Sequence, residues 1–240
     1  MQRVSPPVHL LRVVTHAFFM TAAVAASGAT IKDHNTWDAV SISGPLGQAV
    51  DPAHPWWYAL DVQNKFANNS RKLAQSTWRA GLNYNLNAHW TAYAGFGFTP
   101  TDTPLTSKPN HELRWTQQIG WTGRAGAYTL GARLRVEERH YNTGDDWGVR
   151  TRYQVRASHP VPGCPSLSGL VWNEYFYNLN DTDYGARHGY DQNRLFVGTG
   201  WKLSEITRTE IGYLHNYVHR PGKDDRLNQT ISVSLYLAFK

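Results

Sequence analysis

Residues 129–141, TLGARLRVEERHY, alternate between apolar and polar side chains with a period of two. One set comprises Leu130, Ala132, Leu134 and Val136, and the other comprises Gly131, Arg133, Arg135, Glu137 and Arg139. Because a β-strand points successive side chains to opposite faces, this segment would have one aliphatic face and one ionic face. The chain must therefore fold so that both faces have a suitable environment.

The same alternation recurs in ten segments. They cover residues 56–66, 76–86, 89–99, 112–122, 126–140, 147–158, 166–179, 192–203, 206–220 and 227–239. Alternation sustained over about ten residues per segment is typical of membrane-spanning β-barrels. A closed barrel suits a bilayer because closure leaves no unpaired strand edge in lipid.

The connections between these segments differ in length. Short connections fall at 86–88, 122–127 and 202–206, and long polar ones fall at 99–111, 141–147, 178–192 and 219–228. Outer-membrane barrels have short periplasmic turns and longer extracellular loops. We therefore predict an all-β fold, an antiparallel up-and-down transmembrane β-barrel of ten strands. The connection at 159–166 is rather long for a periplasmic turn.

The N-terminal region divides into two parts. Residues 1–29 have two arginines, a short apolar stretch and small residues that offer cleavage after Ala25 or Ala29, which is the pattern of a secretory signal peptide. A short buried helix is the alternative. Residues 30–55 form an N-terminal segment before the barrel at 56–240. Within it, 35–43 resembles a strand, either terminal or partial, or one strand of a twelve-strand barrel, because bacterial barrels have even strand numbers.

Composition excludes several classes of protein. No apolar run reaches the roughly 18 residues of a transmembrane helix. Cys164 is the only cysteine, so no internal disulfide can form. The net charge of +6 falls to +4 when Arg3 and Arg12 are removed with the leader. This charge comes from scattered arginines rather than a basic block, so we expect no nucleic-acid partner.

The C-terminal segment supports an outer-membrane location. It ends in SVSLYLAFK, an alternating strand that resembles the terminal signal of outer-membrane proteins, although Lys240 follows the aromatic Phe239. A soluble β-sandwich or lipocalin-like barrel is the alternative. It would place the aliphatic rows inward and the arginines in water.

Several of these segments together resemble one bacterial outer-membrane family. They are QNKFANNSRKLAQSTWRAGLNYNL, ELRWTQQIGW, RLRVEERHY, WGVRTRYQVR, VWNEYFYNLND, DQNRLFVGTGW and TEIGYLHNYVHR. The family is known only as domain of unknown function twenty-four-ninety, and the resemblance extends from about Trp37 to Phe239. It implies a barrel and implies no activity.

The candidate functional residues are the ionic side chains of the polar face. They are Arg133, Arg135, Glu137, Arg139, Arg150, Arg152, Arg156, Glu174, Arg194, Arg208 and Glu210. In a narrow barrel, arginine forks could bind carboxylates across the lumen and form an ionic plug. Unpaired arginines would instead line a small pore that favours anions. Both interpretations remain open.

Other functions have weaker support. Paired loop carboxylates (Asp145 with Asp146, Asp181 with Asp183, Asp224 with Asp225) lie near His140, His188, His215 and His219, which would suit a hydrolase site at the extracellular rim. Paired aspartates are more often turn formers, however, and HNYVH is not the HExxH zinc motif. A loop-mediated adhesin or assembly partner is a further alternative.

The sequence thus predicts an outer-membrane barrel of a Gram-negative bacterium with a structural or porin-like role. Its expected partners are outer-membrane lipid, including lipopolysaccharide, and the barrel-assembly machinery, which would engage the C-terminal strand. We expect no cofactor and no metal, and the sequence favours a protein that is not an enzyme.

Overall fold

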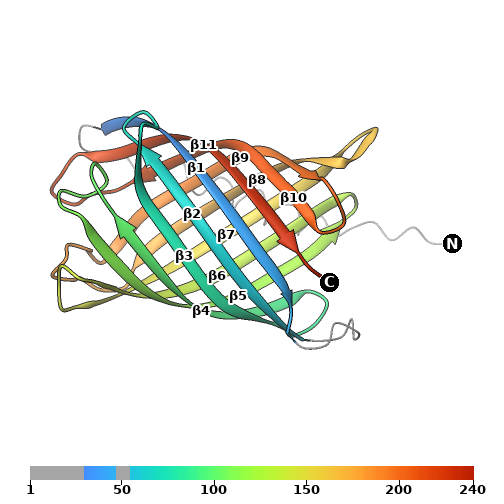
Figure 1. The fold of residues 1–240 in the computed structure, drawn as a ribbon, viewed down its shortest axis with the longest axis horizontal. Helices are drawn as coiled ribbons and strands as arrows, with labels where there is room; N and C mark the ends of the chain where they lie inside the picture. The colour runs from blue at the N-terminus through green and yellow to red at the C-terminus, as the bar shows by residue number, and fades with distance from the viewer. Residues whose placement is uncertain (1–29, 47–54) are drawn as a thin grey trace.

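A computed structural model describes residues 30–46 and 55–240. These residues form eleven β-strands and no helix (Figure 1). The strands are β1 Thr30–Pro45, β2 Trp56–Ala67, β3 Lys72–Asn85, β4 Trp90–Thr101, β5 Asn110–Ala125, β6 Tyr128–Tyr141, β7 Trp147–Val161, β8 Cys164–Asn178, β9 Gly189–Lys202, β10 Thr207–Val218 and β11 Asp225–Ala238. The predicted leader, residues 1–29, lies outside the described residues. Among the described residues, no helix is long and apolar enough to cross a membrane.

The strands close into one barrel in the order β1-β11-β10-β9-β8-β7-β6-β5-β4-β3-β2. Neighbours along the chain pair antiparallel, whereas β1 and β11 pair parallel, with Thr30 opposite Asp225 and Ser43 opposite Ala238. In Figure 1 the first strand, in blue, lies beside the last strand, in red. The predicted all-β barrel is confirmed.

The predicted strand number is wrong. The segment 35–43 lies within β1, which is neither partial nor joined by a twelfth strand among the described residues. An even number is needed only where the first and last strands meet antiparallel. The parallel pairing of β1 with β11 closes a barrel of eleven, and the alternation within each strand could not reveal this.

The two ends of the barrel differ. At one end, here the loop end, the connections are 68–71, 102–109, 142–146, 179–188 and 219–224, and β1 begins there. At the other, the turn end, they include 86–89, 126–127, 162–163 and 203–206. Strands β7 and β8 extend further than expected, so only two residues connect them, and Gly163 adopts a φ of +81° there.

Most apolar side chains face outward and most charged ones face inward, although Leu170, Phe196 and Leu214 form a buried apolar cluster with Trp37. On β6, Leu134 is 39% exposed, whereas Glu137 is 0% exposed. Large apolar side chains also lie exposed on the other strands, including Trp78, Val197 and Ile231. The aliphatic rows therefore face outward and the ionic rows face the interior.

Candidate functional site: the charged interior

Glu137 lies at the centre of an ion-pair network inside the barrel. Arg150 Nη2 and Arg152 Nη1 each donate to its carboxylate at 2.6 Å. Arg114 Nη1 donates at 3.4 Å, and Arg135 Nη1 lies 3.7 Å away. The strand register explains the cluster, because Glu137 lies directly opposite Arg150 in the β6–β7 pair. One fully buried carboxylate therefore contacts four guanidinium groups.

Glu174, on β8, is the second buried carboxylate of this network. Arg152 donates to it from Nη2 at 2.8 and 2.9 Å and from Nε at 3.1 Å. Arg133 forms a short hydrogen bond to the same group, and Arg194 Nη1 lies 3.8 Å from it. Arg152 thus connects Glu174 to Glu137. The Nε atoms of Arg133 and Arg194 are buried and have no hydrogen-bond partner among the described residues.

Two further carboxylates bind arginines nearer the loop end. Glu112 accepts from Arg114 Nε at 2.6 Å and from Arg139 Nε at 3.0 Å. Asp191 accepts from Arg150 Nη1 at 2.9 Å. Sequence reasoning missed Glu112, Arg114 and Asp191. Glu112 and Arg114 occupy polar-face positions of β5, whereas Asp191 lies at a β-bulge between β8 and β9, so alternation along β9 does not place it inside.

Three predicted site residues form a separate cluster towards the turn end. Arg156 and Arg208 both contact Glu210, with Arg208 Nη2 at 3.1 Å from the carboxylate. No ion pair among the described residues joins this cluster to the Glu137 network. Asp61 and Arg79, which were not predicted, pair with each other across β2 and β3. The other eight predicted residues belong to the network around Glu137, Glu174 and Glu112. They are Arg133, Arg135, Glu137, Arg139, Arg150, Arg152, Glu174 and Arg194.

An aromatic layer crosses the interior beside the ion pairs. The guanidinium of Arg194 lies 5.0 Å from the ring centroid of Trp37 and 4.6 Å from that of Phe176. Arg152 lies 4.4 Å from the Phe176 ring, and Lys65 Nζ lies 4.4 Å from the Trp37 ring. We call these five residues the waist. The sequence did contain a signal for the waist. Phe176 lies two residues from Glu174, so this aromatic side chain occupies the same face of β8 as the charged residue.

Two cavities meet at the waist. The cavity at the loop end, here the loop-end chamber, has a volume of about 390 Å³, and the second cavity has about 470 Å³. Both are lined by Trp37, Arg152 and Arg194. Tyr184, from the connection 179–188, lines the loop-end chamber and donates to the carbonyl of Arg139 at 3.2 Å. The waist therefore divides the interior.

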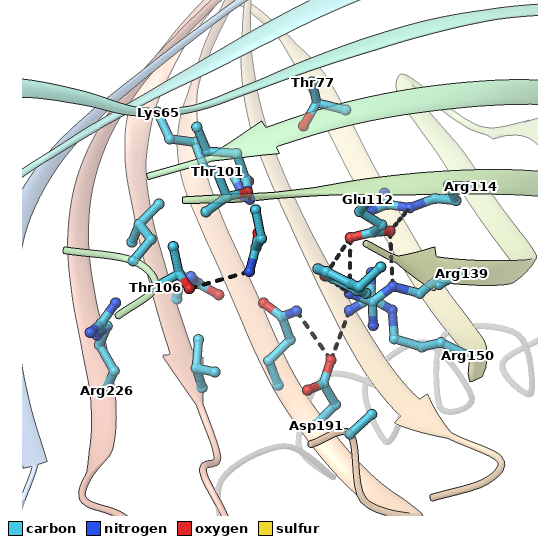
Figure 2. Close-up of a pocket in the computed structure, with 18 of the residues that line it drawn as sticks. Lys65, Thr77, Thr101, Thr106, Glu112, Arg114, Arg139, Arg150, Asp191 and Arg226 are labelled. Atoms are coloured by element: carbon cyan, nitrogen blue, oxygen red, sulfur yellow. Dashed lines mark hydrogen bonds and ion pairs between the residues drawn. The ribbon is translucent and has the colours of Figure 1, made fainter. Parts of the chain in front are cut away.

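The lining of the loop-end chamber is strongly positive. Among the described residues it includes nine cations and two carboxylates: Lys65, Arg79, Arg114, Arg139, Arg150, Arg152, Arg194, Arg220 and Arg226, with Glu112 and Asp191. Figure 2 shows Glu112 and Asp191 bound to arginines on one side, with Lys65 and Arg226 on the opposite side. Chemically, such a chamber attracts anions.

The rim residues considered for hydrolysis occupy structural positions. Asp183 accepts from the backbone N–H groups of Asp145 and Asp146, at 2.7 and 3.4 Å, and these donors hold the pKa of its carboxyl below the usual range. Asp146 accepts in return from the backbone N–H of Asp183 at 2.8 Å. These carboxylates therefore join two loops.

Two further rim carboxylates each contact a neighbouring histidine. Asp181 accepts from the backbone of His188 at 2.6 Å, and Asp225 contacts His219 Nδ1 at 3.1 Å. Within residues 30–46 and 55–240, no three His, Cys, Asp or Glu side chains gather in a way that could hold a metal ion. The structure brings no nucleophile, base and orienting acid together from this set.

The fold and the interior define a closed β-barrel with an arginine-rich, ion-paired interior. The chain belongs to the family described as Protein of unknown function (DUF2490), whose model matches residues 34–228. The resemblance found in the strand segments is thereby confirmed.

Two known proteins are similar to the chain. An uncharacterized protein of Methylorubrum extorquens is 26% identical over 233 residues, which cover 96% of this chain and 99% of the relative. Among solved structures, the outer-membrane expressed OmpT of Vibrio cholerae matches with a TM-score of 0.39 and 12% identity. That match covers 73% of this chain and 60% of the solved chain.

Proposed function

We propose that the protein spans the bacterial outer membrane as a β-barrel and provides a narrow, anion-favouring interior. The observation that carries this proposal is the lining of the loop-end chamber, where nine cations face two carboxylates. Rings of arginine and lysine favour anions in pores because they lower the electrostatic energy of a negative ion.

The outward face supports the membrane location. A transmembrane β-strand needs about 9–11 residues, and the strands here have 12 to 16 residues. Exposed outward side chains include Leu134, Val197 and Ile231, which would lose contact with water in hydrocarbon. We assign the turn end to the periplasm and the loop end to the cell exterior, because short turns are periplasmic in such barrels. A cleaved leader at 1–29 would direct export, and β11 would engage the assembly machinery.

The waist limits what this interior can pass. Phe176 is fully buried, and Trp37 is 4% exposed. Arg194 lies over both rings and Arg152 over that of Phe176, and both arginines line both cavities. We therefore propose a small conductance for monovalent anions rather than the wide aqueous channel of a large porin.

Planar-bilayer recording of the purified, refolded protein tests the proposal. Under a KCl gradient, the sign of the reversal potential reports whether chloride or potassium carries the current. We expect a low conductance that selects chloride. Cation selectivity would contradict the anion-favouring interior, and the absence of current would limit the role of the barrel to binding or structure.

Membrane orientation is tested separately. A cysteine-reactive, membrane-impermeant label applied to intact cells would modify a cysteine introduced at Lys223, in the connection 219–224, but not one introduced at Ser204, in the connection 203–206. The variants would carry Cys164→Ser to remove the native thiol. The opposite pattern would invert the assignment of the two ends.

A further inference from the structure

We infer that the loop-end chamber is a binding site for a small multivalent oxyanion, held between Lys65 and Arg226 on one wall and the ion-paired arginines on the other. This inference deepens the proposed function because it gives the anion-favouring interior a defined site. It does not require that any ion passes the waist.

The charge of the chamber is compensated on one wall only. On the wall formed by β5, β6, β7 and β9, Glu112 and Asp191 bind Arg114, Arg139 and Arg150. On the wall formed by β1, β2 and β11, no carboxylate lies within 4 Å of Lys65 or Arg226 among the described residues. In Figure 2, dashed lines join Glu112 and Asp191 to their partners on one side of the chamber, and Lys65 and Arg226 lie on the opposite side.

Lys65 is the strongest indication of a ligand. Its ammonium lies inside the barrel over the Trp37 ring, at 4.4 Å, and no described residue forms an ion pair or a hydrogen bond with it. Lys65 is half-buried, and a cation–π contact replaces only part of the hydration that its ammonium loses there. A bound anion would supply the missing partner. Arg194, the second cation that contacts the Trp37 ring, leaves its buried Nε without a partner among the described residues and reinforces the same field.

Arg226 and Arg220 extend the positive field to the mouth of the chamber. The guanidinium of Arg226 donates only to the carbonyl of Pro104, at 3.2 Å, and the guanidinium of Arg220 has no carboxylate within 4 Å among the described residues, although its backbone N–H donates to Asp225. The nearest acid on β1, Asp33, accepts from the backbone N–H groups of Asn68 and Asn69, at 3.2 and 3.1 Å. Asp33 forms no ion pair with Arg226 within 4 Å and offsets its charge only in part, so the mouth keeps a positive field that attracts incoming anions.

Size and chemistry define the class of ligand. A volume of about 390 Å³ lies within the range of small-molecule pockets. The lining includes guanidinium groups, whose planar forks match phosphate and carboxylate oxygens, together with an ammonium point charge. Several cations around one cavity favour a ligand with two or more negative charges over chloride. The site therefore suits compact phosphates or polycarboxylates.

Isothermal titration of the refolded barrel in nonionic detergent micelles with pyrophosphate tests this site. We expect saturable binding with one site per chain. The Lys65→Gln, Arg226→Gln double variant should bind at least about tenfold more weakly, because it loses two charge-assisted contacts to the anion. Binding that is unchanged in the double variant, or the absence of saturable binding in the wild type, would overturn the proposal.

Lys32→Gln is the matched control. Lys32 lies exposed on the outer face of β1 near the same end of the barrel, so the substitution removes one positive charge from the chain without altering the chamber. Its affinity for pyrophosphate should equal that of the wild type. An equal loss in Lys32→Gln would attribute binding to overall charge and contradict the site. The heat-modifiable mobility of each variant in SDS gels verifies that the barrel has folded.

The binding and conductance experiments fail independently. Pyrophosphate binding without current would support the binding site and contradict the proposed anion conductance. Chloride-selective current without saturable pyrophosphate binding would support the proposed anion conductance and contradict the binding site. Where both occur, pyrophosphate should reduce chloride current in the wild type more strongly than in the double variant.

Discussion

The ammonium of Lys65 lies 4.4 Å from the centroid of the Trp37 ring, across the β1–β2 pair and inside the barrel. The two residues are register partners, so the contact depends on how the first two strands align. Arg194, from β9, lies 5.0 Å from the same ring. Strand β1, which the sequence predicted only as a possible extra strand, thus carries Trp37, the ring that two cations of the waist contact.

Replacing Trp37 with Ala should open the waist. The substitution removes a ring that is 4% exposed and separates the two cavities, so the cavities should join. We expect a severalfold larger single-channel conductance in planar bilayers and a loss of about 3–5 kcal/mol in unfolding free energy. Trp115→Ala, on the exposed outer face of β5, should leave conductance unchanged. An unchanged conductance in Trp37→Ala would show that the constriction lies elsewhere.

Replacing Glu137 with Gln should destabilise the barrel. The carboxylate is fully buried and contacts four arginines, so its loss leaves buried positive charges without compensation. Breaking a buried ion pair from one side costs about 3–5 kcal/mol. Urea titration of the refolded protein in liposomes would measure this loss. Glu138→Gln, at the neighbouring outward position, should change the unfolding free energy little, and an equal loss in both variants would contradict the role of the network.

An arginine introduced on the outer face should reveal contact with lipid. Leu134→Arg should lower the unfolding free energy in liposomes by about 2–4 kcal/mol, because an arginine near the bilayer midplane is poorly solvated. Tyr128→Arg, at the start of the same strand, should cost about 0–1 kcal/mol because it lies near the interface. Equal effects of the two substitutions would argue against a membrane environment around β6.

Acid should separate the connections 142–146 and 179–188. Backbone N–H donors from Asp145 and Asp146 lower the pKa of Asp183, so the folded form binds the ionised carboxylate more strongly. The resulting stabilisation is complete above the ordinary aspartate pKa and is lost as the pH falls through the lowered value. The protection factor of the Asp145 amide, which is the exchange rate of an unstructured chain divided by that of the amide at the same pH, should be large at neutral pH and fall below that value. Asp183→Asn should exchange faster at neutral pH, and protection independent of pH would contradict this assignment.

The interior residues were predicted unevenly. Arg133, Arg135 and Glu137 occupy the inward positions that alternation indicated. Glu112 and Asp191 were overlooked although they are the carboxylates that line the loop-end chamber. Glu112 occupies a polar-face position of β5, whereas Asp191 lies at the β-bulge between β8 and β9. Nothing local indicated that arginines from other strands would meet either carboxylate.

The sequence by itself determined the side of each strand that faces outward, because side-chain direction follows from the two-residue period of an extended backbone. It also determined ten of the strands, since each alternates independently of its neighbours. Only the tertiary structure decided that β1 closes the barrel in parallel with β11 and that Trp37, Phe176 and Arg194 meet at the waist. These contacts join residues far apart in the chain, and register and closure, rather than any local pattern, bring such residues together.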